Sequence, residues 1–437
     1  MTPSSLLPPR RPASATLLRA RDDTVSTSDA SIRRRIAWIW GLLVLNVLPY
    51  AAKSVLVPLP LSAGKVITQG ALAVATLLAI SINRRVLLRP SLFLLIMSLL
   101  AVTSAMMSVR GYFGLGSILR AARLADVVVV LWLLTPWWGR RDLLFLRYHR
   151  RALSVVLLSV GVGAVLFHGK AFSEGGPGRL GGVIWPVEST LVAHCAALLA
   201  GITIVSWFAH LIRPRTAAIV AGLSVIVLVL THTRTALVGL LAGLVVAGVS
   251  LLLSRQRVRR VFAVTILAGG LIALSFAPFL TSWFLRGQTT AAFTSLTGRV
   301  SVWRELTAQP RAEVNRIFGF GMSNDSFNGR PIDSSWYAAY LNQGLFGDVA
   351  IGAGLLVILL IAVLSPRGPR RAFALLIVTL SFVESLAQTG LGEASPYLLD
   401  LAVAASVLMM PVTGPAEPVA LGRGPAELAS APGSGQL

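Results

Sequence analysis

The sequence predicts an all-α polytopic membrane protein with about 12 transmembrane helices and one long extracytoplasmic loop. Three observations support this fold class. Apolar residues occupy 55% of the 437 positions and charged residues only 13%, against roughly a quarter charged in a soluble domain. Apolar runs of roughly 20 residues, the length that crosses a bilayer as a helix, recur along the chain. Short basic clusters separate these runs.

The apolar runs define the expected spans of one membrane domain, residues 36–412. In chain order the spans cover residues 36–52, 66–82, 91–109, 118–138, 152–168, 183–209, 217–231, 235–253, 261–280, 346–364, 372–389 and 396–412. The two ends of the chain have no apolar period. Residues 1–35 are rich in Ser, Thr, Pro and Arg, and residues 413–437 in Pro, Gly, Ala and Ser, so we expect two disordered cytoplasmic tails.

The basic clusters predict the orientation of the spans, because Lys and Arg beside a span favour the cytoplasmic side. With the N-terminus in the cytoplasm, every second junction is basic, and both termini lie inside the cytoplasmic membrane. The net charge of +22 then reflects topology and does not indicate a nucleic-acid partner. The inside clusters contain Arg33, Arg34 and Arg35; Arg84, Arg85 and Arg89; Arg140, Arg141, Arg147, Arg150 and Arg151; Arg213 and Arg215; Arg255, Arg257, Arg259 and Arg260; and Arg367, Arg370 and Arg371.

Residues 281–345 form the long extracytoplasmic loop of this topology. Loops of this length without a role are uncommon. Trp303 and Leu306 are three residues apart, which places them on one face of a helix. Trp336 and Tyr337 have amphipathic rings of the kind that settle at a membrane interface. We therefore expect short amphipathic helices that lie on the outer membrane surface.

Several kinds of chemistry are not indicated. The single cysteine, Cys195, lies in an apolar run and forms neither an intramolecular disulfide nor a metal site by itself. The sequence contains no P-loop, no Asp-x-Asp metal clamp in a loop, no His-Glu-x-x-His motif and no Rossmann glycine fingerprint. We therefore expect no metal and no cofactor, and neither ATP nor a nucleotide sugar as a substrate.

Three arginines stand on the expected outer face where the backbone enters the membrane. Arg179 is in GPGRLGG, Arg234 in the tight turn THTRTALVG, and Arg299 in TGRVSVW. A guanidinium group is permanently charged and binds phosphate oxygens with paired donors. Three of them on one side of the membrane would hold a lipid diphosphate. Alternatively, each side chain extends to the lipid headgroups.

Asp333 is the acid that precedes the expected span 346–364, in PIDSSWYAAYLNQGLFG. A carboxylate at the outer membrane boundary can accept a proton from a sugar hydroxyl, and partial burial would raise its basicity. Alternatively, Asp333 is a helix N-cap, since Asp before a helical run is a common cap.

Other ionisable residues fall in or near the spans. Acids at membrane depth are costly and often functional, and Glu188 is placed to orient an arginine. Asp126, Glu384 and Asp400 are interpreted as structural, paired with residues such as Arg120 or Arg123.

The histidines divide into three groups. His232, two residues from Arg234, is a rival base. His194 and Cys195 point in different directions on a helix, so they do not form a catalytic pair. His149, His168 and His210 are interpreted as interfacial residues.

Five segments between residues 110 and 365 resemble, in the same order, the O-antigen ligase and polymerase superfamily of membrane glycosyltransferases. They are RLGGVIWPVES, THTRTALVGLLAGL, TGRVSVWRELT, IFGFGMSN and PIDSSWYAAYLNQGLFG. In the ligases the last segment has a His, then Asn, Ser or Gln, then nine residues and Gly-x-x-Gly. Here Asp333 and Ser334 hold the first two positions, and Gly344 and Gly347 close the frame. A group of cell-wall polymerases associated with cell shape has an Asp at the same distance from a Gly-x-x-Gly.

The resemblance implies a fold of the GT-C type and transfer of a glycan from a polyprenyl-diphosphate carrier to an acceptor hydroxyl in surface or cell-wall polysaccharide assembly. It implies Asp333 as the base, with Arg179, Arg234 and Arg299 binding the donor diphosphate in place of a metal. The expected partners are the lipid-linked donor, a glycan or wall acceptor, and membrane lipids. Candidate supporting residues are Glu188, His232, Arg304 and Ser334.

The alternative is a lipid-linked glycan flippase or polysaccharide transporter, since outer arginines can bind a ligand without chemistry. A transporter built from two related halves has a long central inside loop. In this chain that loop, residues 210–216, is short, and the long loop lies off-centre.

Overall fold

The structure is a computed structural model of the chain, and it describes residues 13–50, 61–111, 113–140, 142–173, 178–252 and 299–410. The expected span 261–280, the first part of the long loop and the C-terminal tail 413–437 lie outside these residues, as do residues 1–12.

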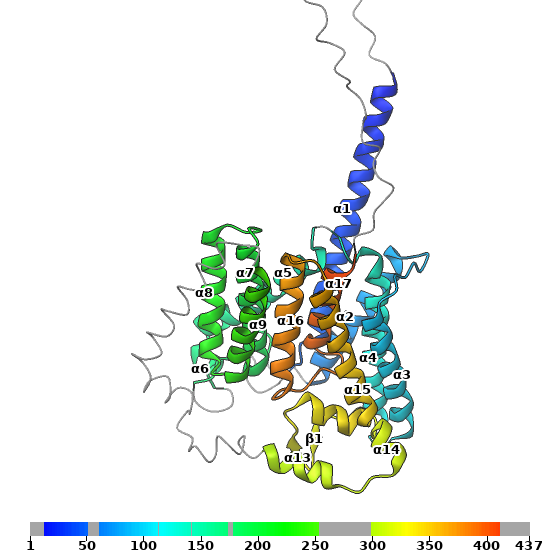
Figure 1. The fold of residues 1–437 in the computed structure, drawn as a ribbon, viewed down its shortest axis with the longest axis vertical. Helices are drawn as coiled ribbons and strands as arrows, with labels where there is room; N and C mark the ends of the chain where they lie inside the picture. Colours follow the sequence, from blue (N-terminus) through cyan, green and yellow to red (C-terminus); the bar gives the residue numbers. More distant parts are fainter. Residues whose placement is uncertain are drawn as a thin grey trace, which may run out of the picture.

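The described residues are mainly helical (Figure 1). In chain order the elements are α1 (Ala13–Val47), α2 (Leu61–Ile82), α3 (Leu92–Arg110), α4 (Gly114–Leu134), the 3-10 turn η1 (Thr135–Trp137), α5 (Leu144–Leu166), α6 (His168–Ala171), α7 (Ser189–Phe208), α8 (Pro214–Leu230), α9 (Arg234–Leu252), α13 (Arg299–Ala308), α14 (Glu313–Phe318), β1 (Ser326–Phe327), β2 (Arg330–Pro331), α15 (Ser335–Leu364), α16 (Pro369–Ser385) and α17 (Pro396–Leu408).

The helices have the length and surface of membrane spans. Six helices among the described residues are long and apolar enough to cross a bilayer: Ser62–Ile82, Leu92–Arg110, Leu144–Leu166, Ser189–Phe208, Arg234–Leu251 and Ser335–Leu364. Large apolar side chains such as Leu77, Leu99 and Val165 point outward and are more than half exposed. An apolar exterior of this extent is stable in lipid rather than in water. The expectation of an all-α membrane protein is therefore confirmed.

The first helix differs from the expected pattern at its start. The first span was expected to begin at residue 36, but α1 begins at Ala13. In Figure 1 its N-terminal part extends beyond the other helices. Residues 13–35 contain Ala, Leu and Arg, which have high intrinsic helix propensity. From Asp29 onward, where the side chains of α1 are described, Ile36 is the first that is fully buried.

Helix α7 is largely buried and packs against α5, α8, α9 and α16. Small residues permit this close packing, as is usual between helices in membranes. A Cβ added at Gly201 of α7 would lie 3.0 Å from the Leu376 side chain, and one at Gly243 of α9 would lie 2.9 Å from the same side chain. Leu376 of α16 therefore fills the groove between α7 and α9.

The described part of the long loop packs on itself. Helices α13 and α14, a short hairpin of β1 and β2, and the first turns of α15 lie together at one end of the bundle (Figure 1). Leu306 of α13 is buried against Ile332 and Leu341, and Trp303 and Tyr337 stack with ring centroids 4.7 Å apart. The apolar face of α13 therefore contacts protein, so the expectation that it lies on the membrane surface is wrong.

Candidate functional site

Asp333 and Arg299 form an ion pair at the loop end of the bundle. Arg299 Nε donates to Asp333 Oδ2 at 3.1 Å. The Arg299 side chain is 33% exposed and the Asp333 side chain is 39% exposed. The pair joins the start of α13 to the residues before α15, so two segments of the predicted outer loop meet at an acid and an arginine that solvent can reach.

The backbone before α15 aims the Asp333 side chain. Asp333 has φ +44°, a left-handed conformation that Asp and Asn tolerate better than most residues. Ser334 occupies the N-cap position, and α15 begins at Ser335. The interpretation of Asp333 as the helix cap is therefore wrong. Trp303 Nε1–H donates to the carbonyl oxygen of Ile332 at 2.7 Å and fixes the preceding residue.

The two glycines of the Gly-x-x-Gly frame are each required for a different structural reason. Gly344 has φ +65° and interrupts α15 with a kink. A Cβ added at Gly344 would lie 2.4 Å from the carbonyl oxygen of Ile317, at the end of α14. At Gly347 a Cβ would lie 2.4 Å from Cβ of Gln343. The kink lets α14 pack against α15, and it separates the first turns of α15, which follow Asp333, from its apolar part.

Arg179 contacts the turn that precedes Arg234. Arg179 Nε donates to the carbonyl oxygen of Thr231 at 3.2 Å, and Arg179 Nη2 donates to Thr233 Oγ1 at 3.4 Å. His232 lies in the same turn with φ +52°, and Arg234 is the first residue of α9. Arg179 therefore holds the turn that carries His232 and Arg234.

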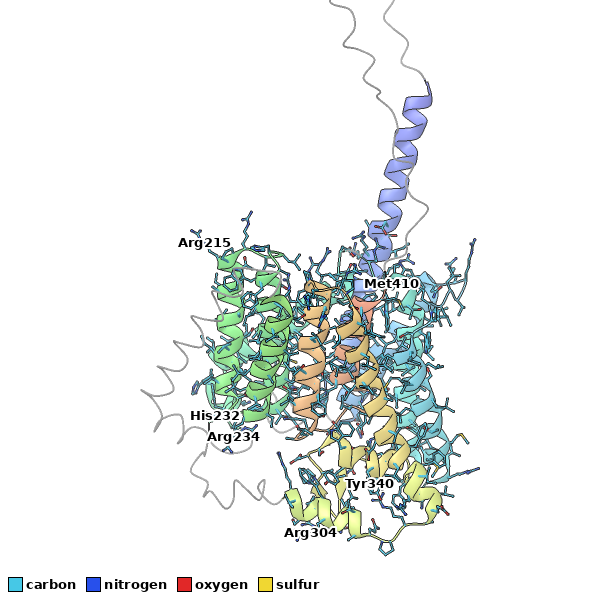
Figure 2. All side chains as sticks on the ribbon, in the orientation of Figure 1. Arg215, His232, Arg234, Arg304, Tyr340 and Met410 are labelled. Carbon is cyan, nitrogen blue, oxygen red and sulfur yellow. The ribbon has the colours of Figure 1, made fainter. Side chains whose placement is uncertain are left out.

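The two segments lie at the same end of α16. Ser335 Oγ donates to the carbonyl oxygen of Gln388, just after α16 ends. A Cβ at Gly239, on the second turn of α9, would lie 3.4 Å from Cγ of Glu384. In Figure 2, His232, Arg234 and Arg304 lie toward one end of the bundle, and Arg215 and Met410 toward the other. Every predicted site residue on these segments is thus at one end, opposite residues predicted to be cytoplasmic.

The remaining predicted site residues differ in burial. Glu188 is exposed and lies at the N-terminus of α7 rather than within it. Arg304 is exposed on α13. Ser334 is 2% exposed and lies between Asp333 and the helix.

A pocket of about 640 Å³ opens beside Ser334. It is lined by aromatic side chains of α13 and α15, by Arg316 and by Asp348. The Trp336 Nε1–H donates to Ser385 Oγ at 3.1 Å, which fixes this ring between α15 and α16. An aromatic pocket with a few polar groups is typical of small-molecule and sugar sites, and this one adjoins the Asp333 segment.

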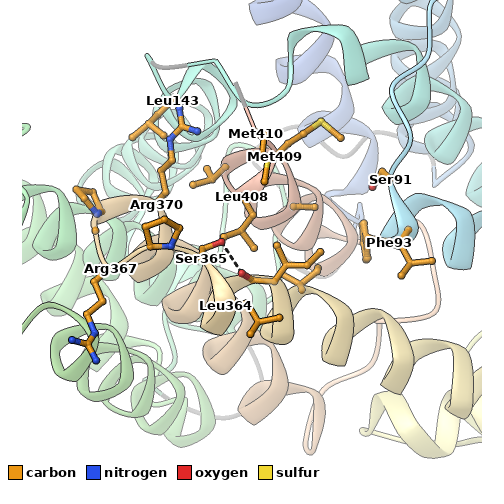
Figure 3. A pocket seen from close by; sticks show the side chains of 18 of the residues that line it. Ser91, Phe93, Leu143, Leu364, Ser365, Arg367, Arg370, Leu408, Met409 and Met410 are labelled. Carbon is orange, nitrogen blue, oxygen red and sulfur yellow. Dashed lines mark hydrogen bonds between the residues drawn. The ribbon is translucent and has the colours of Figure 1, made fainter. Parts of the chain in front are cut away.

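A larger pocket, of about 910 Å³, lies where α15, α16 and α17 meet the start of α3 (Figure 3). Its lining is mostly apolar, with Arg367 and Arg370 at one side. It contains Met410, which Figure 2 places at the end of the bundle opposite Arg234. It therefore belongs to neither group of predicted site residues.

A buried cluster of ionisable side chains was missed at the sequence level. His194 of α7 lies between Glu384 of α16 and Asp400 of α17. His149, expected at the interface, is 2% exposed and contacts Asp400, so that interpretation is wrong. The acids were expected to pair with arginines, but their partners are histidines. The available signal was the presence of two acids and two histidines within apolar runs.

Within the described ranges, no group of three or more His, Cys, Asp or Glu side chains has the geometry of a metal site. The sequence matches no known protein-family model, and a comparison with curated proteins finds no similar one.

Proposed function

We propose that the protein is a membrane glycosyltransferase of the O-antigen ligase and polymerase type, with twelve spans, a GT-C-like fold and both termini in the cytoplasm. It would transfer a glycan from a polyprenyl-diphosphate carrier to an acceptor hydroxyl on the outer side of the cytoplasmic membrane. The observation that carries the proposal is the contact between Asp333 and Arg299. Arg304, on the same helix as Arg299, lies at the same end of the bundle as Arg234 (Figure 2), and Arg179 bonds to the turn before Arg234.

In the proposed reaction the acceptor hydroxyl oxygen attacks the anomeric carbon of the donor sugar. The bond between that carbon and the diphosphate oxygen breaks, and polyprenyl diphosphate leaves with the bonding electrons. The proton of the acceptor hydroxyl passes to the Asp333 carboxylate. This is general base catalysis, and it requires Asp333 to be ionised and within hydrogen-bond reach of the hydroxyl.

The arginines would stabilise the negative charge that develops on the departing diphosphate. Arg299 has a second role, because in the present structure its guanidinium contacts Asp333. A diphosphate carries more negative charge than one carboxylate and would compete for Arg299. Donor binding would then release Asp333 to act as the base, so the reaction would begin only when the donor is in place.

The aromatic pocket beside Ser334 supplies a place for sugar units next to Asp333. Trp336 and Tyr340 line it together with Asp348. Aromatic faces pack against the apolar faces of sugar rings, and carboxylates accept hydrogen bonds from their hydroxyls. We assign this pocket to the glycan nearest the reacting bond.

The proposal is tested by replacing Asp333 in cells that depend on this protein for their polysaccharide. Asp333→Asn keeps the shape of the side chain and its tolerance of positive φ, so it removes the charge alone. We expect full membrane abundance, no polymer product and accumulation of the lipid-linked glycan. Accumulated short units indicate a polymerase, and full-length chains indicate a ligase.

The matched control is Arg330→Gln, which removes a charge from an exposed ion pair with Glu305 in the same loop. It should make normal product. Normal product from Asp333→Asn would refute the assignment of Asp333 as the base.

A further inference from the structure

The buried cluster lies inside the bundle, close to the end of α16 that adjoins the predicted site. His194 Nδ1 is 2.5 Å from Glu384 Oε2, and His194 Nε2 is 2.8 Å from Asp400 Oδ2. All three residues are 1% exposed. Three separate helices, α7, α16 and α17, therefore meet at one imidazole ring.

The neighbours of the two acids are hydrogen-bond donors. Tyr397 O–H donates to Glu384 Oε2 at 3.1 Å. Trp40 Nε1–H donates to His149 Nδ1 at 3.3 Å, so this nitrogen is the acceptor of a neutral ring. The ring proton of His149 is then on Nε2, which lies 2.9 Å from Asp400 Oδ1. Each carboxyl group thus faces His194 and one further donor.

The geometry at His194 requires one more proton than a neutral imidazole and two ionised carboxylates hold. A neutral imidazole has a single N–H, so one ring nitrogen would present a lone pair to a carboxylate oxygen. Two acceptors 2.5 or 2.8 Å apart repel each other unless a proton lies between them. The extra proton belongs on His194, because carboxylic acids are stronger acids than imidazolium and both carboxyl groups have a second donor that favours their ionised form.

We propose that His194, Glu384 and Asp400 form a proton-binding site within the membrane domain, in which His194 is an imidazolium ion held between two carboxylates. The other titratable groups that face this site are His149 of α5, Cys195 of α7 and Tyr397 of α17. With the proton the three residues carry a charge of about −1, and without it about −2. Concentrated charge is costly at membrane depth, so the apolar surroundings keep the proton bound.

The proposal does not depend on glycosyl transfer, and its test uses no activity. The full chain contains five histidines, so its ring nitrogens can be followed by solid-state NMR in lipid bilayers after ¹⁵N labelling of histidine. The measurement is made at about pH 8.5, roughly two units above the ordinary histidine pKa. We expect one histidine with both nitrogens protonated, showing through-space contacts to a Glu and an Asp carboxyl carbon. Neutral rings for all five histidines would overturn the proposal.

Substitution assigns the signal. His194→Gln should remove the imidazolium signal, whereas Asp126→Asn should leave it unchanged, because Asp126 is an acid in another part of the bundle that accepts from Thr76 Oγ1. If His194→Gln does not fold, the carboxyl contacts in the unmodified protein decide the question. An imidazolium signal that persists in folded His194→Gln, or that lacks carboxyl contacts, would contradict the assignment.

Discussion

Asp333 combines a left-handed backbone with a charged partner from a different helix. Residues in sparsely populated backbone conformations cost free energy, and they are often found at functional sites. The cost at Asp333 is small, because Asp is among the residues that tolerate positive φ. The conformation orients the carboxylate toward Arg299 and away from the cap position of α15, which Ser334 occupies.

At the residue scale, we predict that the shape of the Arg299 side chain matters as well as its charge. Arg299→Gln should lower the rate of glycan transfer roughly 100-fold or more, the effect of losing one electrostatic contact to a transition state. Arg299→Lys should give an intermediate loss, because an ammonium group keeps the charge but not the paired donors. Transfer rates of the purified variants measure both effects.

An Arg299→Gln variant that transfers glycan as fast as the unmodified protein would contradict this prediction. Arg330→Gln again serves as the control, since it too removes an arginine from an ion pair in the loop.

At the scale of elements, the kink of α15 at Gly344 sets the position of everything that precedes it. We predict that Gly344→Ala destabilises the protein by at least about 2 kcal/mol, from backbone strain and overpacking of roughly 1–3 kcal/mol each. The physical cause is the positive φ together with a Cβ that would lie 2.4 Å from a backbone oxygen. Thermal unfolding in detergent measures the change.

The control for the kink is Gly352→Ala in the same helix. A Cβ there would have its nearest atoms, in Trp336, 3.9 Å away, so we expect little change or a slight gain from helix propensity. Equal stability of Gly344→Ala and Gly352→Ala would mean that the kink is not a constraint.

The loop between α16 and α17 packs against α15 through a pair of acids. Asn342 Nδ2 donates to Asp325 Oδ1 at 3.0 Å and to Glu393 Oε1 at 3.2 Å. Burial, and then the neighbouring Asp325 carboxyl, raise the pKa of Glu393 well above its usual range. Glu393 is therefore neutral in the fold at a pH where it is ionised in the unfolded chain.

We predict a pH dependence from this pair. A raised folded pKa contributes stability that is fully present below the unfolded pKa, about 4.3, and is lost as the pH rises through the folded pKa. Glu393→Gln resembles the neutral acid, so its unfolding temperature should fall less than that of the unmodified protein as the pH is raised above about 4.3. The comparison variant is Glu313→Gln, whose side chain is exposed. Parallel curves for all three proteins would contradict the assignment.

At the scale of the whole molecule, the positions of the helices follow from local apolar runs. Residues 91–109 and 217–231 were expected to be spans, and α3 covers Leu92–Arg110 and α8 covers Pro214–Leu230. Such runs are visible because a helix forms its hydrogen bonds within one segment. The short apolar helices α8 and α17 and the described parts of α1, α4 and α16 all overlap expected spans.

The contacts between distant segments did not follow from local patterns. His194 is 190 residues from Glu384 and 206 from Asp400, and no spacing rule joins them. Asp333 and Arg299 are 34 residues apart in the sequence. The sequence predicted only that both lie on the outer side of the membrane, not that they contact each other. The packing of α13 on α15 was also missed, because an apolar helix face looks the same whether it meets lipid or protein.

Glycan transfer can be measured with the purified protein in lipid vesicles, supplied with a polyprenyl-diphosphate-linked glycan and an acceptor glycan. We expect a lengthened acceptor together with one released polyprenyl diphosphate for each transfer, and neither product from Asp333→Asn. Transport of the intact donor across the bilayer without either product, or equal product from Asp333→Asn, would contradict the proposed function.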